Sequence, residues 1–160
     1  MGKVIRTFTN GYPGAVSRSN DNVIISMRNG SGAAIPFGSP VFLIAGDNSV
    51  RGFAADTSTA ANFIGIAVRA ADKTPETYGS NDAVFNADDP VDILVRGSTV
   101  LRFANNAVPG ANVYIRKSDG SLVTSSGAEG STIQIPNATV RTARDENDRA
   151  EVVITKRNLL

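Results

Sequence analysis

Residues 91–103 read VDILVRGSTVLRF. In the first half, Val91, Ile93 and Val95 alternate with the residues between them, which is the two-residue period of a β-strand. Gly97-Ser98 interrupts the pattern, and residues that favour strands resume from Thr99 to Phe103. This stretch therefore predicts a long strand with a break or bend at its glycine.

Seven further runs have the same character. They are short, rich in Val, Ile, Thr and Phe, and bounded by Gly, Pro, Asn, Asp and Ser, and they cover residues 23–28, 40–45, 62–69, 111–117, 131–135, 138–143 and 150–156. Asp119-Gly120 lies between two strand-like runs and predicts a tight type I′ hairpin turn. No window carries a convincing helical stripe. The sequence predicts an all-β fold, a small antiparallel β-barrel whose closure removes exposed edges, with a two-sheet sandwich as the alternative.

Two segments do not fit a compact barrel. The N-terminal residues are polar and rich in turn formers, and residues 70–90 form a connection longer than most loops. We therefore expect an extended N-terminal arm over residues 1–22, a β-barrel domain over residues 23–160, and one long loop within that domain. The alternative is that residues 4–9 form the first strand of the barrel.

The composition excludes several classes of function. The chain contains no His and no Cys, so the usual ligands for zinc, copper and iron and the usual nucleophile–base pairs are missing. We expect no enzymatic activity, cofactor, metal or small-molecule substrate. The net charge of +1 gives no field that attracts nucleic acid, and no stretch approaches the roughly 20 apolar residues of a membrane helix. The lack of Trp disfavours a carbohydrate-binding module, and a carboxylate hydrolase is a further, weaker alternative.

The charges and aromatic residues of the two unusual segments identify candidate contact residues. Residues 1–20 carry three basic side chains and no acid, whereas residues 72–92 have a net charge of −5. We expect these segments to contact different partners, the alternative being ordinary solvated loops. The candidate partner-interface residues are Arg6, Phe8, Tyr12, Arg18, Tyr78, Asp88 and Asp89.

Several short motifs, taken in order, resemble one known family. They are Gly11-Tyr12-Pro13-Gly14 with Ser17-Arg18, Ile35-Pro36-Phe37-Gly38 leading into Val41, Lys73-Thr74-Pro75-Glu76-Thr77-Tyr78-Gly79, Val95-Arg96-Gly97, Val113-Tyr114-Ile115-Arg116, and the ending Thr155-Lys156-Arg157-Asn158-Leu159-Leu160. In these motifs the chain resembles the structural cement, or head decoration, proteins of bacteriophages. None of the motifs is a catalytic signature.

The resemblance implies a β-rich protein, made in the cytoplasm of the bacterial host, that binds the outer surface of the assembled capsid. Its partner would be the major capsid protein, and it would act as a homotrimer that braces the virion, with no direct contact to nucleic acid or membrane. The alternative is another virion component, such as a tail or fibre adaptor protein.

Overall fold

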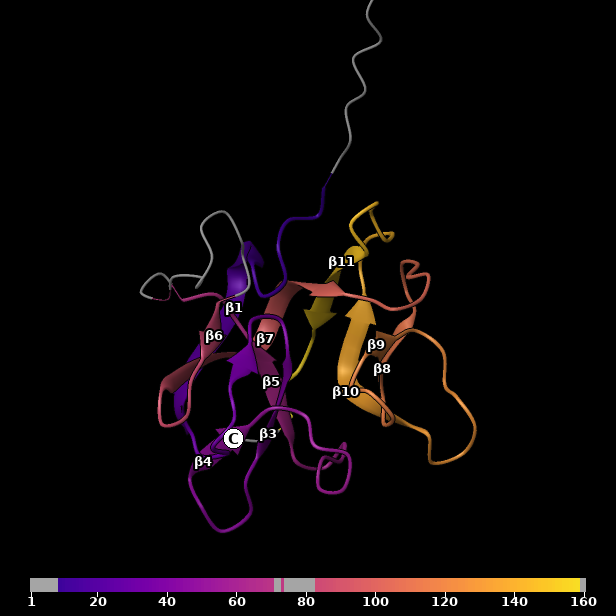
Figure 1. Cartoon of the computed structure of the whole chain (residues 1–160). Helices are drawn as coiled ribbons and strands as arrows, with labels where there is room; N and C mark the ends of the chain where they lie inside the picture. Colours follow the sequence, from indigo (N-terminus) through magenta and orange to yellow (C-terminus); the bar gives the residue numbers. More distant parts are fainter. Residues whose placement is uncertain (1–8, 71–72, 74–82, 159–160) are drawn as a thin grey trace, which may run out of the picture.

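The computed structural model describes residues 9–70, 73 and 83–158, and every regular element in that part of the chain is a β-strand. Figure 1 shows their arrangement. The strands are β1 (Val16–Asn29), β2 (Ile35–Pro36), β3 (Pro40–Leu43), β4 (Ser49–Arg51), β5 (Phe63–Ala67), β6 (Val84–Phe85), β7 (Pro90–Arg102), β8 (Asn112–Arg116), β9 (Leu122–Val123), β10 (Thr132–Val140) and β11 (Arg149–Ile154). The predicted all-β class is confirmed.

Five strands close into a barrel in the order β1-β4-β3-β5-β7, because β7 pairs back with β1. Four of the five contacts in this ring are antiparallel, and the contact between β1 and β4 is parallel. The predicted barrel is confirmed, but the expectation of a purely antiparallel one is wrong at this contact. A ring with an odd number of strands cannot alternate direction throughout, so one parallel contact is unavoidable.

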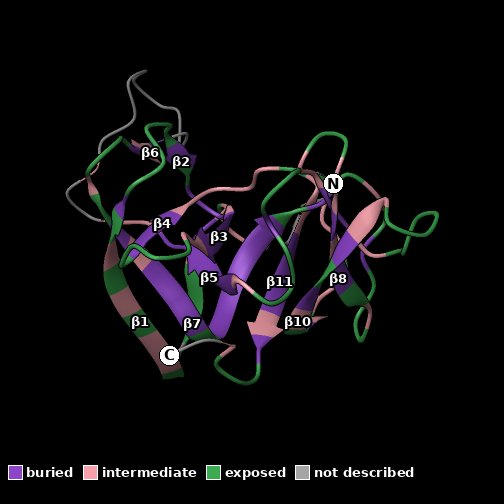
Figure 2. Ribbon diagram, turned by 90° about the horizontal axis from the view of Figure 1, so that it is seen from below, coloured by how far each residue is buried: buried purple, intermediate pink, exposed green. Residues whose placement is uncertain are grey.

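The stretch at residues 91–103 forms most of β7, which is the central strand of the sheet. The first half of β7 pairs with β5 on one side and β1 on the other, and its second half pairs with β11 and again with β1. From β11 the sheet continues through β10 and β8 to β9. Figure 2 shows β7 running between β1 and β11. The two halves meet at Gly97, whose φ of 124° is open to glycine alone.

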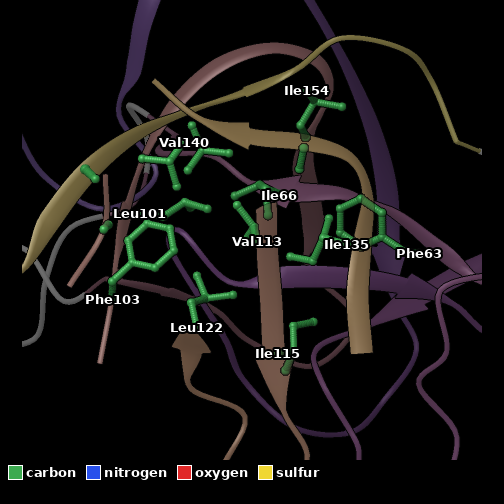
Figure 3. Close-up of a cluster of buried hydrophobic side chains, with 14 of the residues drawn as sticks. Phe63, Ile66, Leu101, Phe103, Val113, Ile115, Leu122, Ile135, Val140 and Ile154 are labelled. Atoms are coloured by element: carbon green, nitrogen blue, oxygen red, sulfur yellow. The ribbon is translucent and has the colours of Figure 1, made fainter. Parts of the chain in front are cut away.

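Two apolar clusters fill the two spaces that this arrangement creates. One lies inside the barrel and includes Ile35, Ile64, Phe85 and Ile93. The other, shown in Figure 3, lies between the barrel and the C-terminal strands and includes Phe63 and Phe103. Because β5 contributes to both clusters, every one of its residues is buried.

Two local predictions need correction. The first strand begins at Val16 rather than near residue 23, because Val16 and Arg18 pair with Thr99 and Ser98 of β7 although the residues that follow Val16 are polar. The predicted boundary between arm and barrel at residue 22 therefore lies inside β1, while residues 1–8 lie outside the described residues. At the β8–β9 hairpin, Gly120 has a positive φ and Asp119 does not, so the turn is not type I′.

Candidate functional site

The candidate contact residues fall at two separate ends of β1. Arg6, Phe8 and Tyr78 lie outside the described residues. Tyr12 and Arg18 lie at the beginning of β1, where Arg18 pairs with Ser98. Asp88 and Asp89 lie at its other end, immediately before Pro90, which pairs with Arg28. From residue 90 to residue 98 the strand covers about 26 Å, so the two groups form separate surfaces rather than one site.

Tyr12 lies in a group of arginines. The Cζ atom of Arg149 is 4.7 Å from the centre of the Tyr12 ring, and that of Arg69 is 5.7 Å from it. Arg69 also lies 5.4 Å from the ring of Phe37. Tyr12 remains 46% exposed. Tyr and Arg are enriched at protein interfaces, so this exposed aromatic–guanidinium group, the Tyr12 surface, has the composition of a docking site.

The backbone beside Tyr12 is held firmly by the rest of the protein. Gly14 donates to the carbonyl of Val100 at 2.9 Å, and Arg149 donates to the carbonyl of Gly11 at 2.8 Å. A Cβ at Gly14 would lie 2.8 Å from the backbone nitrogen of Gly38. The motifs around Tyr12 and Phe37, far apart in sequence, therefore pack directly on one another.

Asn10, two residues before Tyr12, is also bound to distant parts of the chain. Its backbone N–H donates to Asp145 at 2.8 Å, and its side chain donates to the carbonyls of Ala143 and Arg149. Burial raises the pKa of Asp145, but the hydrogen bonds from the N–H groups of Asn10, Arg149 and Asn147 outweigh it and lower that pKa overall. The carboxylate of Asp145 thus joins the N-terminal segment to the β10–β11 connection.

Arg18 is bound within its own chain. Its Nε donates to Glu151 at 2.8 Å, and Ser17 donates to the same carboxylate at 2.9 Å. The side chain of Glu151 is 7% exposed, whereas that of Arg18 is 58% exposed. The guanidinium therefore balances a buried charge and also keeps an open face toward solvent.

The two predicted aspartates also have partners. Asp88 binds Arg28 at 2.9 Å, and its side chain is 77% exposed. Asp89 binds Lys73 at 2.6 Å and accepts the N–H of Asn86 at 2.8 Å. The hydrogen bond from Lys73 and then that from Asn86 lower the pKa of Asp89. Arg28 also binds Asp47, so this acidic corner is a network of ion pairs with Asp88 as its most exposed acid.

Among the described residues, no group of three or more acids is placed to hold a metal ion, and no helix in that part of the chain could cross a membrane.

Sequence reasoning missed the cations that surround the predicted residues, namely Arg28, Arg69 and Arg149. The excess of Arg over Lys, 12 to 4, was the one signal that pointed to them.

Known proteins of phage capsids resemble this chain in sequence and in fold. A sequence model of the family described as "Structural cement protein (E217 gp24/Pam3 gp6)" matches residues 2–155. A chain in "The capsid of Myoviridae Phage XM1" has a similar fold, with a TM-score of 0.72 and 17% identity over 96% of this chain and 95% of that chain.

A second structure, "The crystal structure of head fiber gp8.5 N base in bacteriophage phi29", gives a TM-score of 0.44 and 13% identity over 86% of this chain and 99% of that chain. A search of curated protein sequences finds no match. The family match spans almost the whole chain, and it decides the assignment. The protein belongs to the phage structural cement protein family and is a non-enzymatic component of the phage capsid.

Proposed function

We propose that this cement protein binds the outer surface of the assembled capsid as a symmetric homotrimer and braces the lattice formed by the major capsid protein. The observation that carries the proposal is the family match over residues 2–155. A single chain of this size makes limited contacts with a lattice. Three linked copies engage it together and gain avidity without any new chemistry, which favours a closed, symmetric assembly.

The Tyr12 surface is the better candidate for the main contact with the capsid protein. It combines an exposed aromatic ring with the guanidinium groups of Arg69 and Arg149 and is held in place by backbone hydrogen bonds. A fixed surface loses little conformational entropy on binding. The arm residues Arg6 and Phe8 precede it in the chain and would dock on the capsid or on an adjacent copy, with Arg18 pairing with capsid carboxylates.

The acidic corner would serve a different role. Asp88, at the edge of its ion-pair network, together with Asp89 and Tyr78, would face a basic surface on the capsid protein or on a neighbouring copy. Because exposed charges at the rim of an interface act mainly on the association rate, we expect this contact to steer binding rather than to hold it.

A cryo-electron microscopy map of the purified virion tests the proposal. We expect copies of the chain on the outside of the shell, related in threes by a symmetry axis, with Tyr12 facing the capsid protein. Copies on the inner surface, or isolated copies at positions without a three-fold relation, would contradict it. A variant with Tyr12 changed to Ala should bind purified capsids more weakly, whereas the change of exposed Val108 to Ala should not.

A further inference from the structure

Among the described residues, one edge of β1, the open edge, has no partner strand over most of its length, because the ring closes against β4 only at one end of β1. Within the described residues, β1 meets β4 at Arg28 and Asn29 alone, whereas it pairs with β7 along most of its length. From Val23 to Met27, the side of β1 that faces away from β7 therefore has no partner strand among these residues. Figure 2 shows this part of β1 at the margin of the barrel. An unpaired strand edge is a template for another strand.

The direction of the backbone groups follows from the neighbouring hydrogen bonds. Asn29 donates to the carbonyl of Asp89 and accepts the N–H of Asp88, so its backbone groups point toward the β7 side. Gly30 donates to Val50, on the opposite side. Because these directions alternate along a strand, Ile25 and Met27 point toward β7, while the N–H and carbonyl groups of Ile24 and Ser26 point out of the open edge.

The side chains along this edge are incompletely covered. Val23, Ile25 and Met27 pack against the apolar cluster inside the barrel and yet are partly buried rather than buried. Ile24, on the outer face, is 46% exposed. An added strand would cover these apolar side chains and would pair the backbone groups of Ile24 and Ser26.

The charge around the edge favours a basic occupant. The acids near β1 are Asp21, Asp47, Asp88, Asp89 and Asp92, and the bases that bind or adjoin them are Arg28, Lys73 and Arg96, which leaves a net charge of −2. The N-terminal sequence from Lys3 to Phe8, Lys-Val-Ile-Arg-Thr-Phe, carries two bases and no acid. It also contains apolar residues of the types that favour strands, so its chemistry complements the edge.

The arm of the same copy cannot reach this position. Asn10 is bound beside Arg149, which pairs with Arg102 at the far end of β7, whereas Ile25 pairs with Ile93. Residues 93 to 102 of β7 cover about 30 Å. The five residues from Asn10 back to Ile5 span at most about 18 Å even when fully extended. An arm that pairs with this edge would therefore come from another copy.

We infer that residues 3–8 of one copy add a strand to the open edge of β1, along Val23–Met27, in a neighbouring copy. The inference rests on the proposed assembly of several copies on the capsid and specifies how they are joined. Each copy gives its arm to the next and receives one from the previous copy. Such a head-to-tail exchange closes into a ring when the copies are related by a rotation axis.

A proline at position 26 tests the role of the edge. The N–H of Ser26 points away from β7, so Ser26→Pro removes an outward donor and leaves the pairing of β1 with β7 intact. Ser26→Ala is the matched control, because it removes the same contact to Asp92 and keeps the N–H. Ile25→Pro removes a bond to β7 and should unfold the barrel.

We expect Ser26→Pro to melt within a few degrees of Ser26→Ala and to leave decorated capsids at least tenfold faster on dilution. A chain lacking residues 1–8 should behave in the same way. Equal dissociation rates for Ser26→Pro and Ser26→Ala would overturn the inference. If Ser26→Pro itself melts far below Ser26→Ala, the crosslinking experiment below decides the question in the chain with native Ser26.

Crosslinking identifies the occupant directly. The chain has no cysteine, so Ile5→Cys provides a single attachment point for a benzophenone probe. The labelled protein is bound to capsids together with an unlabelled, heavy-isotope form of the native chain, illuminated and digested. We expect the probe to be attached to heavy peptides that contain Val23–Met27.

Attachment to a peptide of the capsid protein, or to another region of this chain, would overturn the inference. Both outcomes leave the proposed function standing, because binding of the protein to capsids is measured separately in the same sample. Failure of the labelled and the native chain to bind capsids would instead contradict the proposed function.

Discussion

The carboxylate of Glu151 connects the first and last strands of the protein. It lies on β11, accepts hydrogen bonds from Ser17 and Arg18 of β1, and is largely shielded from solvent. Burial raises its pKa, but the hydrogen bonds from Arg18 and Ser17, with the charges of Arg18 and Arg141, outweigh burial and lower the pKa below its usual value of 4.5. The ionised form is therefore the one that stabilises the fold.

We expect Glu151→Gln to lower the free energy of unfolding by about 1–3 kcal/mol at pH 7, because Arg18 then loses its charged partner. Since the folded-state pKa is lowered, the contribution of the native carboxylate is complete above about pH 4.5 and is lost as the pH falls through the folded-state pKa. Urea unfolding at pH 7 and pH 3 should show a difference between the two proteins that shrinks at pH 3. The exposed Glu129→Gln is the control, and an equal difference at both pH values would contradict this assignment.

Strand positions could be predicted where the apolar pattern is long enough to read, as in β7, β10 and β11. The two-residue strands β2 and β9 could not, because so short an element has no periodicity and exists only through its partner. The strand β6 lies within residues 83–85, which the sequence marks as the one possible strand of the long loop. The parallel contact of β1 with β4 follows from the number of strands in the ring, which no local pattern contains.

Only some of the contact residues could be predicted from the sequence. Tyr12 stood out because it is an aromatic residue in a polar, turn-rich segment, and its exposure agrees with that interpretation. The arginines around it come from distant parts of the chain, and only the fold brings Arg69 and Arg149 to its ring. Similarly, the sequence predicts an acidic loop but not the ion pairs that Arg28 and Lys73 form with its two aspartates.

Close packing of β5 against β7 requires a glycine at position 65. A Cβ there would lie 2.2 Å from the carbonyl oxygen of Leu94, and a backbone atom cannot move aside without breaking the sheet. We expect Gly65→Ala to destabilise the protein by about 1–3 kcal/mol or more. Gly52→Ala is the matched control, because its Cβ would meet only Ile35 at an ordinary 3.7 Å. Thermal melts should separate the two variants, and equal melting temperatures would show that the β5–β7 contact is not tightly packed.

For the molecule as a whole, the acidic corner should govern how fast the protein finds the capsid. We expect Asp88→Asn with Asp89→Asn to slow association with capsids several-fold at low salt, because two charges that steer the encounter are lost. The effect should fade as salt screens the remaining charges. Asp56→Asn with Glu129→Gln makes the same change in net charge at exposed positions elsewhere. Surface plasmon resonance on immobilised capsids gives the rates, and an identical salt dependence in both variants would leave the corner as ordinary solvated surface.

Two truncations locate the boundary between the arm and the folded body. The division at residue 22 is a prediction from the sequence, but the structure shows Asn10, Gly14 and Arg18 bonded to distant strands. We expect a chain lacking residues 1–8 to melt cooperatively near the temperature of the full protein. A chain lacking residues 1–20 also loses the first part of β1 and the partners of Asp145 and Glu151, and each lost hydrogen bond costs about 1 kcal/mol.

The longer truncation should therefore melt at least ten degrees lower or fail to fold, since about 1 kcal/mol corresponds to roughly 2–4 °C for a chain of this size. Circular dichroism melts of both proteins give the comparison, with capsid binding measured on whichever chains remain folded. The shorter truncation should fold and bind capsids more weakly, because it lacks Arg6 and Phe8. If the chain lacking residues 1–20 melted like the full protein, the arm would extend to residue 22 as the sequence pattern indicates, and the hydrogen bonds of Asn10 and Arg18 would contribute little to stability.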